Sequence, residues 1–161
     1  MLVTMLFMGL LALTSTSLTV RGLQRTDRDT RRAQEALQSM IEEVRGRSRQ
    51  AADDPLGWSA GLANVLGAGG ALGAAFAVPG LQAVPGEAGA LTVQLVTDET
   101  QDDAALGVRL GMPRDLNADG DAVDADVTAD ARLLPVIVRV RWNNGQGLRD
   151  HAQGLFLSVV Q

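Results

Sequence analysis

The chain lacks cysteine, lysine and tyrosine, and it has one histidine among its 161 residues. The absence of cysteine excludes disulfide bonds, cysteine-ligated zinc, iron–sulfur clusters and a thiol nucleophile. A single histidine excludes a metal centre built from several imidazoles. The net charge is -5, and only two Trp and three Phe are present. Because nucleic-acid binding requires a basic surface, this composition predicts no nucleic-acid partner.

The charges divide the chain into three parts. Residues 1–20 carry no charged side chain, and residues 21–49 carry eight arginines against five acids. Residues 50–161 carry six arginines against fourteen acids. An uncharged segment, a basic segment and then an acidic segment form the layout of a membrane-anchored protein with a domain outside the bilayer.

Residues 1–20 are expected to form a retained transmembrane helix. As a helix they would span about 30 Å, which is the thickness of the hydrocarbon core of a bilayer. Two alternatives stay open, namely a cleaved secretory signal, for which a basic start is expected, and a buried helix of a soluble core. The arginines from Arg21 onward would hold the C-terminal side in the cytoplasm, unless further positive charges precede Met1.

The helix is expected to continue beyond the membrane segment. Ala33, Leu37, Ile41 and Val44 recur at the spacing of one helical face, with charged residues between them. Gly46 is a stop signal, so residues 21–46 form the amphipathic half of the same helix. The residues that follow are rich in Gly and Pro, which predicts a loop-rich connection rather than a core element.

The C-terminal part of the chain predicts a small antiparallel sheet. Leu91–Thr97 and Leu133–Trp142 alternate apolar and polar residues, as half-buried strands do. Asn143-Asn144-Gly145 predicts a hairpin turn, with Leu155–Val160 as the returning strand. Val108–Leu110 is a candidate fourth strand. The fold class is therefore α+β, with the chain divided into residues 1–20, residues 21–46, a connection at residues 47–90, and a sheet domain at residues 91–161.

An acidic loop at residues 115–126 matches the calcium-binding pattern D-x-[DN]-x-[DN]-G-x5-E, except that its last position is Asp. In that pattern the oxygens at the first, third and fifth positions converge on one ion, and a glycine allows the sharp turn. The predicted calcium ligands are Asp115, Asn117, Asp119, Asp121 (through its carbonyl) and Asp126. The shorter reach of Asp126 predicts a Kd of about 10⁻⁴–10⁻³ M. The alternative is a solvated acidic loop without an ion.

Three stretches resemble the type IV pilin and pseudopilin superfamily, especially its minor pilin-like members. MLVTMLFMGLLAL at the start resembles the segment after the family's processing site, with Gly9 at the place of the glycine inside the membrane span. ALQSMIEEVRG (Ala36–Gly46) resembles the end of the family's long helix. Met112–Trp142 resembles the C-terminal part of prepilin-like proteins that carry a calcium loop. A basic leader and a G-F-[ST]-L-x-E processing motif are expected upstream of Met1.

The resemblance implies a structural subunit of a type IV pilus or a type II secretion pseudopilus, with no enzymatic activity. Its partners would be other pilin or pseudopilin subunits, the inner-membrane assembly machinery and, if the upstream motif exists, prepilin peptidase. The chain would cross the bacterial inner membrane once, with its sheet domain in the periplasm or outside the cell. Gly9 would let neighbouring helices approach closely.

Two other functions stay open. One is an anchored calcium-dependent binding module that does not polymerise. The other is an esterase built on Gly57-Trp58-Ser59-Ala60-Gly61, followed by Asp150 and His151 in hydrolase order. The residues before Ser59 do not predict the buried strand that such a motif requires, so no catalysis is expected.

Overall fold

The computed structural model describes the backbone of residues 2–159 and the side chains of residues 23–159. Within these residues it contains one long helix, three short helical segments and a three-stranded antiparallel sheet. The elements are, in chain order, α1 Leu2–Gln50, the 3-10 turn η1 Ala51–Asp53, α2 Trp58–Leu66, β1 Leu91–Leu95, α3 Asp103–Leu106, β2 Leu133–Asn143 and β3 Leu148–Ser158. The predicted α+β class is confirmed.

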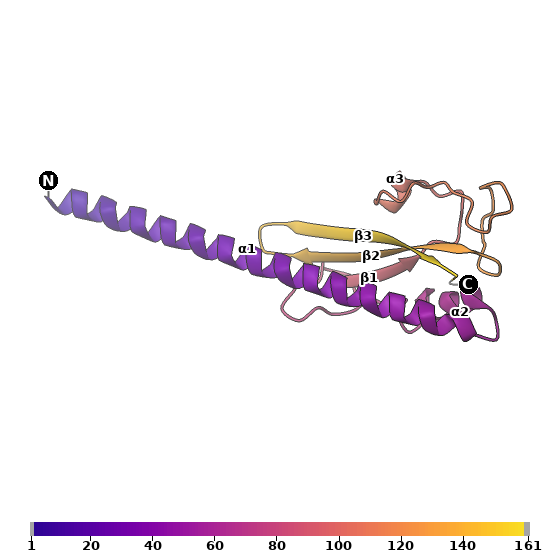
Figure 1. Cartoon of the computed structure of the whole chain (residues 1–161). Helices are drawn as coiled ribbons and strands as arrows, with labels where there is room; N and C mark the ends of the chain where they lie inside the picture. Colours follow the sequence, from indigo (N-terminus) through magenta and orange to yellow (C-terminus); the bar gives the residue numbers. More distant parts are fainter. Residues whose placement is uncertain (1, 160–161) are drawn as a thin grey trace.

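The C-terminal half of α1 lies against the sheet, whereas its N-terminal half extends beyond it (Figure 1). Ala33, Leu37, Ile41 and Val44 are buried, so the predicted apolar stripe is the face that contacts the rest of the protein. Burying one aliphatic side chain of this size stabilises a fold by about 1.5–3 kcal/mol. This stripe therefore fixes α1 to residues 51–159, which we call the head.

The prediction that the helix ends at Gly46 is wrong, because α1 continues to Gln50. Arg47 donates a hydrogen bond to the carboxylate of Glu43, one turn earlier, at 2.8 Å. Ser48 is buried, and its hydroxyl accepts a hydrogen bond from the indole Nε1 of Trp58 at 3.2 Å. A glycine inside a helix costs only about 1 kcal/mol, and the packing of this last turn outweighs that cost.

Helix α2 lies inside the stretch that the sequence predicts to be loop-rich. Trp58, Leu62 and Leu66 are buried on one face of this helix, and Leu62 is 0% exposed. The prediction of no core element there is therefore wrong. The close approach of Asp54 explains the glycine at position 61 of this helix, because a Cβ there would lie 2.8 Å from the Asp54 side chain.

Strand β2 is the centre of the sheet, which has the order β1-β2-β3 with antiparallel pairing throughout. Val138 lies opposite Val93 on β1 and opposite Gln153 on β3. Alternate residues of the predicted strand share one face, and they are buried: Val136, Val138, Val140 and Trp142 are at most 1% exposed. Strand β3 begins at Leu148, seven residues before the predicted start. Residues 149–151 are polar and gave no apolar pattern, but they pair with β2 at the edge of the sheet.

The candidate fourth strand at Val108–Leu110 is a loop that covers the other face of the sheet. The carboxylate of Asp103 accepts hydrogen bonds from the backbone N–H groups of Leu110, Gly111 and Met112 at 2.9–3.0 Å. These donors are therefore not available to a sheet. The loop lies close to Gly154, where a Cβ would come within 2.4 Å of the Leu110 side chain.

No helix among residues with described side chains has an apolar stretch long enough to cross a bilayer. The predicted transmembrane segment, residues 1–20, and the predicted packing residue Gly9 lie outside those residues, since only the backbone of residues 2–22 is described.

Candidate metal centre

Backbone hydrogen bonds join the acidic loop to the rest of the head at two places. The segment after β1 runs beside the end of the loop, where Glu99 N–H donates to Asp124 C=O and Val127 N–H donates to Thr97 C=O, both at 2.9 Å. At the other place the carbonyl of Leu116 accepts hydrogen bonds from the N–H groups after the loop. Leu116 and Val127 are each 1% exposed, so the core holds both ends of the loop.

Glu99 is the buried acid of this region, with 0% of its surface exposed. Its Oε1 accepts hydrogen bonds from the backbone N–H groups of Leu116 and Asn117. Its Oε2 is also buried and has no hydrogen-bond partner among the described residues. A buried carboxylate oxygen without a partner is costly, because it has lost its hydration.

Glu99 forms a group with two acids of the loop. One carboxylate oxygen from each of Glu99, Asp121 and Asp124 lies within 4.8 Å of the others. Burial raises the pKa of Asp124 above its usual value, and the negative charges of Asp119, Glu99 and Asp121 raise it further. A cation placed among these oxygens would reverse the repulsion and supply the partner that Glu99 Oε2 lacks. The group can therefore bind a metal ion, and its oxygen donors suit a hard cation.

Of the five predicted ligands, Asp121 is in this group, but with its carboxylate and not with the carbonyl that the sequence predicts. The other four lie in the same loop, and the side chain of each accepts a hydrogen bond from a residue two to five positions further along the chain. Asp115 accepts from the backbone N–H groups of Ala118 and Gly120 at 2.6 and 3.0 Å. Asn117 accepts from the N–H of Asp119 at 3.1 Å and donates its amide to Asp124 at 3.2 Å.

Asp119 and Asp126 likewise fix turns of the loop. Asp119 accepts from the N–H of Asp121 at 3.1 Å, and Asp126 accepts from both the N–H and the hydroxyl of Thr128. The hydrogen bonds from Thr128 lower the pKa of Asp126 below its usual value. In the structure, therefore, Asp126 stabilises the end of the loop, and Asp124 lies in the carboxylate group instead.

Sequence reasoning missed Glu99 and Asp124 as members of this carboxylate group. Asp124 lies at a loop position to which the calcium pattern assigns no ligand, and Glu99 lies outside the loop altogether. The one signal for Glu99 was its place just after a predicted strand, where a carboxylate is carried to the edge of the sheet.

The residues of the candidate esterase lie apart in the fold. Ser59 is buried on α2 and lines a hollow together with residues 129–132. His151 is on β3 and lines a different hollow. Asp150 lies 3.8 Å from the guanidinium of Arg139 and 3.9 Å from that of Arg141, so its charge is directed to those arginines.

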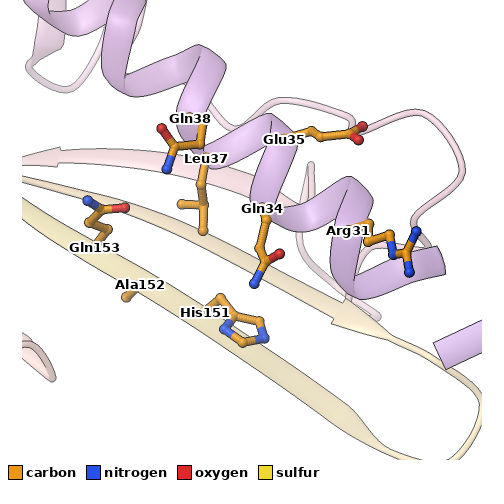
Figure 2. Close-up of a pocket in the computed structure, with 8 residues that line it drawn as sticks. All are labelled: Arg31, Gln34, Glu35, Leu37, Gln38, His151, Ala152 and Gln153. Atoms are coloured by element: carbon orange, nitrogen blue, oxygen red, sulfur yellow. The ribbon is translucent and has the colours of Figure 1, made fainter. Parts of the chain in front are cut away.

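The hollow beside His151 is a groove of about 770 Å³ between α1 and β3. Figure 2 shows Gln34 and Leu37 of α1 pointing toward β3, with the His151 ring close to Gln34. On its own sheet the His151 ring stacks on Trp142, with the ring centres 5.4 Å apart. The groove therefore separates α1 from the edge strand at His151, whose ring is held by its own sheet.

Replacing Asp124 by asparagine should raise the melting temperature of the metal-free protein at pH 7. Because folding raises the pKa of Asp124, the ionised carboxylate destabilises the folded state once the pH exceeds that pKa. Asparagine removes the charge and keeps an oxygen that can accept the hydrogen bond from Asn117. The difference from the wild type should shrink as the pH falls below the raised pKa. It should vanish only below the ordinary value of 3.8, where the carboxyl of the unfolded wild type is protonated too.

Thermal melts in EDTA between pH 4 and pH 7 test this expectation. Asp130→Asn is the matched control, because Asp130 is exposed and lies outside the carboxylate group. A lower melting temperature for Asp124→Asn at pH 7 in EDTA would show that the carboxylates do not strain the folded loop.

A long N-terminal helix packed on a three-stranded antiparallel sheet is compatible with a pilin-like fold. The acidic group lies in the head, where Asp121 and Asp124 of the loop between α3 and β2 meet Glu99 of the segment between β1 and α3. Comparison of the chain with protein-family models, with curated proteins and with solved structures finds no match.

Proposed function

We propose that the chain is a structural subunit of a pilus-like or pseudopilus-like fibre, held in the bacterial inner membrane before assembly. The observation that supports this most is the asymmetry of α1. One continuous helix of 49 residues packs on the head with its C-terminal half and extends beyond the sheet with the rest (Figure 1). A free helical half with no charged residue from 1 to 20 suits both a bilayer and the packed interior of a helical fibre.

In this proposal the chain performs no catalysis. Residues 1–20 anchor it in the membrane, the head stays on the outer side, and the partners are further copies or related subunits and the inner-membrane assembly machinery. Membrane helices associate by close packing, and Gly9 offers a site without a side chain where a neighbouring helix can approach. Prepilin peptidase is a further partner if a leader with the processing motif precedes Met1.

The metal of the acidic loop is proposed to be calcium. Calcium takes six to eight oxygen ligands in flexible geometry, whereas magnesium requires a strict octahedron. The carboxylates of Glu99, Asp121 and Asp124 come from a buried segment and a loop, and a loop adapts more easily to calcium. Calcium would join the loop to the segment after β1 and so stiffen the outer surface of the head.

Self-association in a bilayer tests the assembly proposal. The chain lacks cysteine, so a single Leu148→Cys variant can be labelled at one exposed site on β3. Mixed donor-labelled and acceptor-labelled full-length chains in lipid vesicles should show energy transfer that an excess of unlabelled chain removes. Gly9→Leu should weaken the association about tenfold or more, since close helix packing is lost.

Gly22→Leu is the matched control, because it makes the same change in the same helix beyond residues 1–20. It should leave the energy transfer nearly unchanged. A chain that stays in the vesicles without energy transfer at any density would contradict assembly, and an anchored module that does not polymerise would then be the better account.

A further inference from the structure

A polar hollow, separate from the two described above, lies at the end of the head nearest to the N-terminal half of α1. It has a volume of about 410 Å³ and is formed by three segments: α1 from Arg25 to Arg32, the connection around Gly80, and the turn between β2 and β3. Figure 1 shows this turn pointing toward the N-terminal half of α1. Its volume is within the range of about 300–1,000 Å³ typical of small-molecule sites.

The helix side of this hollow carries an excess of positive charge. Arg25, Arg28 and Arg32 line it, against one carboxylate, Asp29. Arg32 is held in place, since its guanidinium lies 3.9 Å from Asp29 and donates to the carbonyl of Gly80 at 3.4 Å. Arg25 and Arg28 are exposed, and neither has an ion pair among the described residues. Two guanidinium groups are therefore available to an anion.

The turn side of the hollow supplies further hydrogen-bond donors. The side-chain oxygen of Asn143 accepts the N–H of Gly145, and that of Asn144 accepts the N–H of Gln146, both at 2.9 Å. Because the oxygens are used in this way, the NH₂ groups of the two asparagines are left for other partners. The Nδ2 of Asn144 is buried and has no hydrogen-bond partner among the described residues. A buried donor without an acceptor is costly, and a bound anion would satisfy it.

We propose that this hollow, which we call the arginine–asparagine pocket, binds a phosphate group. Guanidinium groups bind phosphate oxygens through two parallel hydrogen bonds, and amide donors add to them. A phosphate offers several oxygens in a tetrahedron, which suits donors that converge from a helix and a turn. Both soluble phosphate and the headgroup of an anionic phospholipid have this chemistry.

The Arg25 edge of the pocket lies close enough to the bilayer for a lipid headgroup to be one source. If residues 1–20 cross the bilayer, Arg25 lies about 8 Å beyond the hydrocarbon core, at a helical rise of about 1.5 Å per residue, whereas Arg28 and Arg32 lie about 12 and 18 Å beyond it. The headgroup layer is about 5–8 Å thick on each side of that core. The lipid source rests on the proposed membrane anchor, whereas binding of a phosphate group does not.

Calorimetric titration of the full chain with inorganic phosphate, in neutral detergent at low salt and pH 7, tests the pocket. The wild type should show saturable binding of one phosphate per chain. Arg28→Gln should weaken the binding about tenfold or more, because a charge-assisted hydrogen bond is lost. Asn144→Ala should weaken it severalfold. Arg31→Gln is the matched control, since Arg31 is exposed on the same helix and lines another hollow.

Repeating the titration after reconstitution into phosphatidylglycerol nanodiscs separates the two sources. Loss of phosphate binding in nanodiscs would mean that a lipid headgroup already fills the pocket, and unchanged binding would indicate a soluble ligand. Absence of saturable binding in detergent would overturn the proposal. Equal losses of phosphate affinity in Arg28→Gln and Arg31→Gln would overturn it as well. Phosphate would then be attracted by the overall positive charge of the helix and not bound in the pocket. Failure of the helix to associate in vesicles would contradict fibre assembly and leave this result untouched.

Discussion

Glu99→Gln is expected to abolish the rise in melting temperature that calcium gives the wild-type protein. With a Kd of about 10⁻⁴–10⁻³ M, calcium at about 10 mM should stabilise the wild type by about 1.4–2.7 kcal/mol. Glutamine is nearly the same size, and its oxygen can accept the hydrogen bonds from Leu116 and Asn117 that Glu99 Oε1 accepts. It cannot supply the negative charge that a hard cation requires.

Glu99→Ala should have a second effect, which is independent of metal. It leaves the buried N–H groups of Leu116 and Asn117 without an acceptor, at a cost of about 1–3 kcal/mol for each. Glu99→Ala should therefore melt well below the wild type in EDTA, whereas Glu99→Gln should stay closer to it.

Thermal melts with EDTA, calcium or magnesium measure both effects. Glu35→Gln is the control for charge, because Glu35 is exposed on α1 and far along the chain from the loop. A wild-type melting curve that is the same in EDTA and in calcium would remove calcium from the function. If calcium still raises the melting temperature of Glu99→Gln, Glu99 is not a ligand, and the five ligands that the sequence predicts would be the better account of the site.

The metal centre shows how far a sequence pattern can lead. The spacing within residues 115–126 identified the acidic loop, and it included Asp121, although as a ligand through its carbonyl rather than its carboxylate. It could not identify Glu99, because the pattern considers one continuous loop. Glu99 joins the loop only because Thr97 and Val127 are hydrogen bonded and both ends of the loop are anchored in the core. Such pairing depends on the whole fold.

The fold was predicted most accurately where one periodic pattern determined it. The apolar stripe of α1 is buried as predicted, and so are Val136, Val138, Val140 and Trp142 of β2. Ile137 is buried too, on the opposite face of β2, because the loop after α3 covers that face. Strand β3 was predicted too short because residues 149–151 are polar and carry no apolar alternation. Its length is determined by pairing with β2, which continues to Leu148. Helix α2 was missed because glycines favour turns, although Gly61 is needed for contact with Asp54.

Leu62→Ala should destabilise the head by about 2–5 kcal/mol, the range for removing a fully buried leucine side chain. Leu62 is 0% exposed at the centre of α2, so the smaller side chain leaves a cavity that the surrounding core fills only in part. Each kcal/mol should lower the melting temperature by about 2–4 °C for a protein of this size. Leu56→Ala makes the same change at a residue that is 65% exposed, and it should alter the stability by at most about 0.5 kcal/mol.

Urea unfolding of the full chain in neutral detergent, followed by tryptophan fluorescence, distinguishes a core helix from a loose connection. Trp58 reports from α2, and Trp142 reports from β2 on the far side of the core. Phenylalanine in place of either one isolates the signal of the other. If α2 belongs to the core, Leu62→Ala should shift both transitions to lower urea by the same amount, because the helix and the sheet unfold together. A shift confined to the Trp58 signal would mean that α2 unfolds independently and that residues 58–66 function as a connection, as their glycine content alone predicts.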